Sequence, residues 1–210
     1  MTDKKILYRK IFAGLAIMFL STLAALFLRS SGAITHRPAP EFRTKGPADA
    51  KIVIEEFTDF ACPACKEAGA HLEKIAKIYE GKIRIIFKHN PLLSIHPYSM
   101  DAAVFSDCAG RQGKFWEYAK VLFENQQEWS RAQDKNKHFL SYAERFKLDE
   151  DSLKNCVRSE DAARAVKMDL LEGKIRNIDA TPTFFINGKR AVGSGQLLEQ
   201  AKLFDGIANR

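Results

Sequence analysis

The spacing of apolar residues predicts a strand, a helix and a second strand in the first half of the chain. Residues 52–54 (Ile-Val-Ile) are consecutive strand formers. Residues 82–89 alternate between apolar and polar positions, which is typical of a half-buried strand. Residues 65–80, between them, have the three- to four-residue apolar spacing of a helix. A strand–helix–strand unit of this kind predicts parallel, right-handed pairing of the two strands.

A long helical region follows the second predicted strand. Asp149 and Asp161 lie at the expected starts of its later helices and are of the type that opens a helix. The region is too long for a single crossover connection, so we expect a helical subdomain, at about residues 98–176, inserted in the sheet domain. Helical apolar spacing recurs through five segments, at residues 98–111, 114–126, 135–146, 149–158 and 161–176.

The C-terminal part predicts a hairpin and a closing helix. Asn187-Gly188 is the strongest short-range signal for a two-residue hairpin turn. The predicted elements are a strand at residues 181–186, a return strand at 189–192 and a helix at 196–207, with Gly193 and Gly195 marking the exit from the hairpin. Strands and helices together place the chain in the α/β class.

The first 49 residues have a different character. Residues 11–28 are a mostly apolar, uncharged run behind a basic flank at residues 1–10. The run is close to the lower length limit for a membrane-spanning helix and exceeds the apolar core of a signal peptide, so we predict a retained anchor. Small residues at 31–33 (Ser-Gly-Ala) leave a cleaved signal peptide as the alternative. Residues 29–49, rich in proline and glycine, are predicted to be a linker without regular structure.

Charge is unevenly distributed along the chain. The formal net charge is +7, and residues 1–34, with five basic residues and one acidic residue, contribute +4 of it. A basic flank before an apolar helix stays in the cytoplasm, which places the rest of the chain outside. The remaining charges of both signs are mixed along helices, so the basic balance does not indicate nucleic-acid binding. A length of 210 residues suits one domain plus a targeting segment.

Two cysteines, Cys62 and Cys65, lie where the first strand gives way to the helix. Free N–H groups and the positive end of the helix dipole favour an anion there, so we expect the pKa of Cys62 to fall below that of a free cysteine. Pro63 suits the first helical turn because its missing N–H is no loss. A structural zinc site is the alternative, but neither the other cysteines nor the five histidines supply a second closely spaced ligand pair. We therefore expect redox chemistry and no metal.

Two glutamates precede the cysteines on the first strand. Glu55 and Glu56 point to opposite faces of the sheet. A strand covered on both faces would bury one of them beneath the cysteines, where desolvation would raise its pKa and suit it to accept a proton from a buried thiol. Alternatively, both lie at the solvent end of the strand, and periodicity alone does not choose between these arrangements.

Three motifs stand in a characteristic order along the chain. They are residues 56–65 (Glu-Phe-Thr-Asp-Phe-Ala-Cys-Pro-Ala-Cys), residues 113–116 (Gly-Lys-Phe-Trp) and residues 180–183 (Ala-Thr-Pro-Thr). Together with the strand, the helix, the inserted helices and the Asn-Gly hairpin, they closely resemble the DsbA family of thioredoxin-fold thiol–disulfide oxidoreductases. The resemblance covers residues 50–210 and implies a thioredoxin fold with an inserted helical subdomain.

The resemblance also implies roles for individual residues. Cys62 would be the exposed nucleophile of a redox-active disulfide, and Cys65 its buried partner. Pro182 would be a cis-proline facing this disulfide, and the backbone of Thr181 would contact an extended client. Glu56 matches the buried acid of the family. The Pro-Ala between the cysteines departs from the histidine-containing dipeptide of the strongest oxidants, which leaves the reduction potential open.

The activity implied is that of an exported enzyme, without a cofactor, that introduces disulfide bonds into translocated proteins by exchange at Cys62-Pro63-Ala64-Cys65. Its partners would be exported proteins with free thiols and a quinone-linked membrane protein that reoxidises it. It would act on the periplasmic side of the cytoplasmic membrane, held by residues 11–28 or soluble after signal cleavage. A reductase or isomerase is the first alternative, and a reduction potential near that of thioredoxin would favour it. The second is a non-redox chaperone, whose function would survive loss of both cysteines.

Cys108 and Cys156 remain, and both fall on predicted helices of the inserted subdomain. In an oxidising compartment such a pair is usually bonded, so we predict a structural disulfide between them. The alternative is two inert, buried thiols that pack as small hydrophobic groups.

Overall fold

The computed structural model describes residues 2–30 and 38–209. The chain forms two compact units, Met1–Pro38 and Ala39–Arg210. The first contains helix α1 (Thr2–Ser30), in which the segment Tyr8–Leu26 is long and apolar enough to cross a membrane. This segment overlaps the predicted anchor at residues 11–28. Residues 31–33, proposed as the alternative cleavage site, lie outside the described residues.

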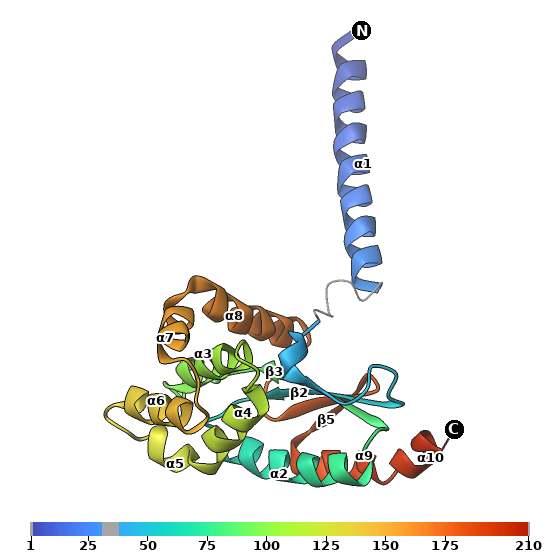
Figure 1. Ribbon diagram of the computed structural model, residues 1–210. Coiled ribbons are helices and arrows are strands. Elements are labelled where there is room, and N and C mark those ends of the chain that lie inside the picture. The colour runs from blue at the N-terminus through green and yellow to red at the C-terminus, as the bar shows by residue number, and fades with distance from the viewer. Residues whose placement is uncertain (1, 31–37, 210) are drawn as a thin grey trace. The chain divides into compact units, whose positions relative to one another are not determined.

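The second unit is built on a five-stranded sheet with the strand order β1-β3-β2-β4-β5 (Figure 1). Strands β2 and β3 are parallel, with Ile54 opposite Ile85, which confirms the predicted strand–helix–strand unit. The other three pairs are antiparallel. The strands are β1 (Thr44–Lys45), β2 (Ile52–Thr58), β3 (Ile83–His89), β4 (Thr183–Ile186) and β5 (Lys189–Val192).

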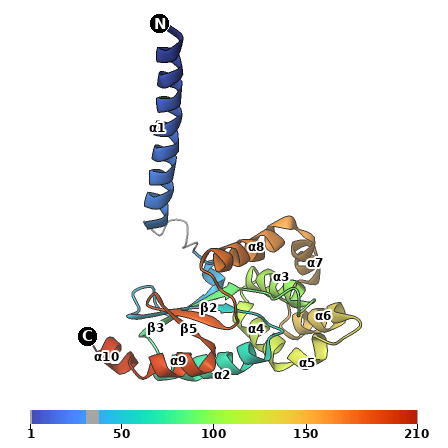
Figure 2. The same ribbon diagram turned by 180° about the vertical axis from the view of Figure 1, so that it is seen from behind.

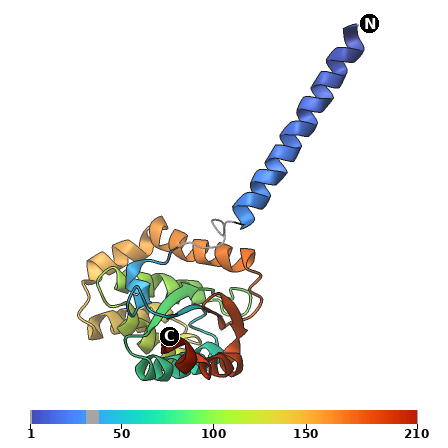
Figure 3. The same cartoon turned by 90° about the vertical axis from the view of Figure 1, so that its right-hand side faces the viewer.

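Helices cover both faces of the sheet. Helices α2, α9 and α10 lie on one side and α3, α7 and α8 on the other (Figures 1 and 2), and the side view shows the sheet between these layers (Figure 3). The helices are α2 (Pro63–Ile78), α3 (Ser99–Gly110), α4 (Phe115–Glu124), α5 (Gln126–Trp129), α6 (Lys135–Arg145), α7 (Glu150–Arg158), α8 (Glu160–Ile175), α9 (Gly193–Ala201) and α10 (Phe204–Ala208). Helices α3 to α8 form the predicted inserted subdomain, which confirms the expected architecture.

The buried core residues form two clusters. Ile52 and Ile54 point towards α2 and α9, where they pack with Leu72 and Leu197. The second cluster joins the inserted helices to Phe60 before α2 and Phe87 of β3, and it includes the fully buried Trp129. A side-chain cap stabilises the start of α7. Asp149 is its N-cap residue and accepts a hydrogen bond at 2.7 Å from the N–H of Ser152.

The C-terminal prediction is correct for the hairpin and wrong for the closing helix. Asn187 and Gly188 have φ values of 47° and 83°, as a tight hairpin turn between β4 and β5 requires. The helix begins at Gly193, where the Gln196 side chain accepts a hydrogen bond from the N–H of Val192. It then breaks before α10. Leu197, Ala201 and Phe204 keep helical spacing across this break, so apolar spacing does not reveal it.

The predicted linker at residues 29–49 is also wrong in its second half. The 3₁₀ turn η1 (Glu41–Arg43) and β1 belong to the sheet domain, and β1 pairs with β3. Phe42 lies against Gly110 so closely that a Cβ atom there would be 2.4 Å from the phenylalanine ring. The centroid of the Phe42 ring is 5.9 Å from the centroid of the Phe115 ring. Packing against the inserted helices therefore gives this segment a structure that its local sequence does not predict.

A buried network of charges lies between β3 and the helices α3 and α8. Arg43 is fully buried and forms ion pairs with Asp107 of α3 and Asp169 of α8. Asp107 also accepts a hydrogen bond at 2.9 Å from Nε2 of His89. Burial and the nearby Arg43 lower the pKa of His89, so this imidazole is neutral at pH 7. Arg43 thereby joins the N-terminal edge of the domain to two helices of the insert.

The inserted helices are also joined covalently. Cys108 of α3 and Cys156 of α7 form a disulfide across a sequence separation of 48 residues. In the chain-entropy model, closing a loop of this length stabilises the fold by roughly 4 kcal/mol.

Replacing Arg43 with methionine should destabilise the domain by about 3–5 kcal/mol, because Asp107 and Asp169 would keep their charges in the interior without their main partner. Urea unfolding followed by tryptophan fluorescence measures this loss. Arg84→Met is the matched control. Arg84 pairs at 3.7 Å with the exposed Glu41 and donates at 3.4 Å to the carbonyl oxygen of Gly46, so its loss should cost less than about 1 kcal/mol. Equal losses in the two variants would contradict a stabilising role for the buried network.

Candidate active site

The two cysteines lie at the junction of β2 and α2. Cys62 is the N-cap of α2 with extended backbone angles, and Pro63 is the first helical residue. The N–H of Cys65 bonds to the carbonyl oxygen of Cys62 at 3.1 Å, which closes the first turn. Cys65 is fully buried, whereas Cys62 is 9% exposed and is thus less open than the sequence suggested. Both cysteines are free thiols in the structure.

A distant segment of the chain faces Cys62. The peptide bond between Thr181 and Pro182, just before β4, is cis. The sulfur of Cys62 lies 3.5 Å from the carbonyl oxygen of Thr181, to which the protonated thiol donates a hydrogen bond. The Thr183 hydroxyl bonds to the carbonyl oxygen of Ala180 at 2.7 Å and fixes the loop locally. The structure therefore brings together Cys62, Cys65, Thr181 and Pro182, all named from the sequence.

The two thiols have opposite acidities. The hydrogen bond from Cys65 is the largest influence on Cys62; it outweighs burial and, with the N–H groups of Ala64 and Cys65, lowers the pKa of Cys62 from 9.0 to about 5. At neutral pH Cys62 is therefore a thiolate. Burial raises the pKa of Cys65 far above its usual value, and the neighbouring Cys62 raises it further. One sulfur is activated as a nucleophile and leaving group, and the other stays protonated.

Asp59 and Gln126 fix the turn formed by residues 59–62, just before α2, which we call the active turn. Neither residue was identified from the sequence. The buried Asp59 carboxylate accepts hydrogen bonds from four donors, and its own N–H lies 3.4 Å from the sulfur of Cys65. Gln126 of α5 donates to the carbonyl oxygens of Phe60 at 2.7 Å and Cys62 at 3.0 Å. Asp59 lies within the first motif, which was its only sequence signal. Gln126 had none, because its contact depends on how the insert packs.

Both glutamates of β2 are buried, so the arrangement with exposed side chains is wrong. Glu55 forms an ion pair with Arg176 at 2.9 Å on the α8 side of the sheet. Glu56 points to the α2 side, where its Oε1 atom has no hydrogen-bond partner among the described residues. Desolvation raises the pKa of Glu56 from 4.5 to about 7, although a hydrogen bond with Thr58 opposes this shift. The two neighbours therefore differ sharply in environment.

Among residues 2–30 and 38–209, no group of three or more His, Cys, Asp or Glu side chains is arranged to hold a metal ion. The site consists of two sulfurs, a buried carboxyl group and the backbone around the cis peptide bond. Such a set can exchange a disulfide with another thiol.

Comparisons with known proteins agree with this geometry. A family model described as Thioredoxin matches residues 39–203. The match begins at the N-terminal edge that Arg43 and β1 complete. It includes every proposed site residue and the Cys108–Cys156 disulfide.

Curated relatives carry a similar segment within much longer chains. The Na(+)/H(+) antiporter NhaA 3 of Salinispora tropica is 33% identical over 149 residues, which are 71% of this chain and 22% of the antiporter. NhaA 1 of Salinispora arenicola is 34% identical over 150 residues, with the same two shares. The chain thus spans about a fifth of the length of these relatives.

Solved structures share the fold across most of the chain. The alpha-DsbA1 protein of Wolbachia pipientis superposes with a TM-score of 0.70 at 23% identity, covering 82% of this chain and 93% of that one. BdbD of Bacillus subtilis superposes with a TM-score of 0.67 at 25% identity, covering 80% and 95%. The chain belongs to the thioredoxin family, and within it has the fold of the DsbA-like oxidoreductases.

Proposed function

We propose that this protein is a thiol–disulfide oxidoreductase that introduces disulfide bonds into exported proteins. The environment of Cys62 carries the proposal. A thiol with a pKa of about 5 at the start of a helix, 3.5 Å from the carbonyl oxygen of Thr181, is suited to form and release mixed disulfides. The likeness to DsbA-type structures supports the same reaction class.

The reaction begins from the disulfide between Cys62 and Cys65. A client thiolate attacks the sulfur of Cys62, the Cys62–Cys65 bond breaks, and its electron pair passes to Cys65, which takes up a proton. A second client thiolate then attacks the client sulfur of the mixed disulfide and expels Cys62 as a thiolate. The client gains a disulfide and loses two electrons, which the reduced Cys62–Cys65 pair now holds.

The low pKa of Cys62 favours this direction over the reductase and isomerase alternatives. A stable thiolate is a good leaving group, and its stabilisation favours the reduced enzyme, which makes the oxidised enzyme a stronger oxidant. The non-redox chaperone has no comparable support, because binding an extended peptide requires no activated thiol.

Thr181 and Pro182 would bind the client beside the reacting sulfur. The cis peptide bond places the carbonyl oxygen of Thr181 next to Cys62, ahead of β4. An extended client segment can add main-chain hydrogen bonds to the half-buried backbone of Thr181 without a requirement for particular side chains. That mode suits an enzyme that acts on many sequences.

Glu56 would move the proton of Cys65. Cys65 must gain a proton when the enzyme is reduced and lose it when the enzyme is reoxidised, although it is fully buried. A carboxyl group with a pKa of about 7 can give or accept a proton at neutral pH. Glu56 is buried on the face of the sheet that α2 covers, the helix that carries Cys65.

The apolar helix α1 would hold the enzyme at the cytoplasmic membrane with its domain on the periplasmic side, or would direct its export as a signal peptide. Its clients are exported proteins with free thiols. Reoxidation needs an acceptor for two electrons, and we assign this role to a quinone-linked membrane protein.

Replacing Cys65 with serine should trap mixed disulfides between Cys62 and exported clients. They form when the Cys62 thiolate attacks a client disulfide and expels a client thiolate, and Cys65 is no longer present to attack Cys62 and release the client. Non-reducing gels of acid-quenched cells detect them as adducts that disappear on reduction. Cys62→Ser should form no adducts and should abolish turnover. Adducts of equal abundance in both variants would rule out Cys62 as the nucleophile.

The rate of Cys62 alkylation by iodoacetamide should rise with pH with a midpoint near 5 in the reduced protein, since only the thiolate reacts. Cys65→Ala should move the midpoint towards 9, because it removes the hydrogen bond that contributes most to the shift. A wild-type midpoint near 9, measured by mass spectrometry of the labelled peptide, would remove the main support for the proposal.

Replacing Glu56 with glutamine should stabilise the domain at pH 8.5, by up to about 3 kcal/mol. The folded state raises the pKa of Glu56 from 4.5 to about 7, so the ionised form destabilises the fold above pH 7. This destabilisation fades as the pH falls through 7 towards 4.5, and the gain should fade with it. Glu55→Gln is the control and should destabilise, since it breaks the ion pair with Arg176. Urea unfolding at several pH values tests both, and a pH-independent effect of Glu56→Gln would contradict the raised pKa.

A further inference from the structure

Helix α8 reverses the usual polarity of a surface helix. Such a helix normally buries its apolar side chains and exposes its charged ones. In α8 the acidic Asp169 and Glu172 are only 3% and 4% exposed, whereas the apolar Leu171 is 48% exposed. Buried basic side chains hold the two carboxylates, since Arg43 pairs with Asp169 and Lys88 donates to Glu172 at 2.8 Å. The buried charge network therefore determines which face of α8 points outward.

The outward face of α8 is apolar and basic. Met168 and Ile175 are exposed like Leu171, and their spacing of three and four residues places all three in one stripe. The exposed Lys167 and Lys174 lie beside this stripe, one near each end. The acidic side chains within residues 162–175 are the two buried ones, so no exposed acid on this part of the helix offsets the lysines. An exposed apolar stripe with a basic border suits a partner that is itself apolar and anionic.

The N-terminal segment of the domain lies beside this helix (Figure 2). Arg43, near the start of the domain, pairs with Asp169, the residue that follows Met168. Seven residues, 31–37, separate helix α1 from Pro38. An extended chain of that length spans at most about 25 Å. An α1 retained in a membrane would therefore keep this part of the domain within a short distance of the lipid surface.

We propose that the outward face of α8 docks on the anionic lipid surface of the membrane that α1 spans. Met168, Leu171 and Ile175 would lie among the lipid headgroups, with Lys167 and Lys174 directed to the lipid phosphates, as in helices that lie in a membrane interface. Docking would give the domain one orientation at the membrane. This inference rests on the proposed retention of α1 and is independent of disulfide exchange.

Methionine methyl NMR of the full chain in lipid nanodiscs provides the test. The chain has four methionines, of which Met168 lies in the stripe and Met100 packs against the core of the insert. Discs of phosphatidylglycerol and phosphatidylcholine would contain a trace of lipid with a gadolinium chelate on its headgroup. Paramagnetic broadening falls steeply with distance, so the Met168 resonance, assigned with Met168→Leu, should broaden far more than that of Met100. Pure phosphatidylcholine discs or high salt should remove most of this difference.

Charge reversal tests the contribution of the two lysines. The double variant Lys167→Glu, Lys174→Glu should lower the ratio of docked to undocked domain by about tenfold or more, because both side chains would then be repelled by anionic lipid. The broadening of Met168 should fall accordingly. Both lysines are exposed, so the fold should be retained, and an unchanged Met100 chemical shift would show it.

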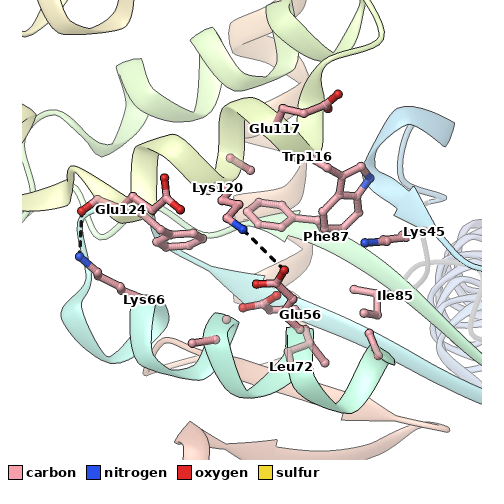
Figure 4. A pocket seen from close by; sticks show the side chains of 16 residues that line it. Lys45, Glu56, Lys66, Leu72, Ile85, Phe87, Trp116, Glu117, Lys120 and Glu124 are labelled. Atoms are coloured by element: carbon pink, nitrogen blue, oxygen red, sulfur yellow. Dashed lines mark hydrogen bonds and ion pairs between the residues drawn. The ribbon is translucent and has the colours of Figure 1, made fainter. Parts of the chain in front are cut away.

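Helix α2 supplies the matched control. It covers the other side of the sheet, where its inward Leu72 lines a cavity (Figure 4). Its outward face also combines two exposed lysines, Lys74 and Lys77, with an exposed apolar side chain, that of Ile78. The double variant Lys74→Glu, Lys77→Glu changes the net charge by the same amount and should leave the broadening of Met168 unchanged.

Four results would overturn the proposal. A Met168 resonance that broadens no more than that of Met100, or that broadens equally in pure phosphatidylcholine, would show that anionic lipid does not bind this face and would leave it to a protein partner. Equal losses in the two double variants would indicate unspecific attraction of a basic protein. A change at Met168 that appears only in discs holding two copies would place a second copy of the chain there. A chain that does not stay with the discs would contradict the proposed anchor itself, and the docking of α8 with it.

Discussion

The arrangement of the active turn depends on one buried carboxylate, that of Asp59. It accepts hydrogen bonds from the N–H groups of Ala61 and Leu92 at 2.8 Å, from Nδ1 of His96 at 2.8 Å and from the hydroxyl of Ser99 at 2.5 Å. A buried charge with this many donors fixes its surroundings, since any displacement would leave the charge unsatisfied. The turn before Cys62, the loop after β3 and the start of α3 are therefore held as one piece.

The sequence predicted those elements and turns whose conformation is set by the residues within them. Cys62 and Pro63 could be placed at a helix start because the strand before them and the helix after them have distinct periods. Asn187 and Gly188 specify their turn almost without context. The resemblance supplied the positions of Pro182 and Glu56, which no periodicity could assign, since their importance comes from proximity to residues far away in the chain.

What could not be predicted comes from long-range packing of polar groups. Arg43 lies in a stretch that reads as a linker, and only its burial against Asp107 and Asp169 makes that stretch part of the domain. Gln126 reaches the active turn because α5 begins beside it, a result of how the insert folds. Trp116 and Phe123 of α4 line a cavity, although helical apolar spacing predicts only that such residues are core. Buried polar contacts have no period, so pattern analysis does not detect them.

The disulfide within the insert has a consequence for the biogenesis of the protein. Cys108 and Cys156 leave the ribosome as thiols, and joining α3 to α7 requires that two electrons be removed from each newly made chain. Under the proposed activity, an immature copy is thus itself a substrate for the reaction that mature copies perform. The first molecules exported into a compartment without an oxidant would lack the Cys108–Cys156 disulfide. A few mature molecules could oxidise this pair in later copies, as long as their own Cys62–Cys65 pair is reoxidised.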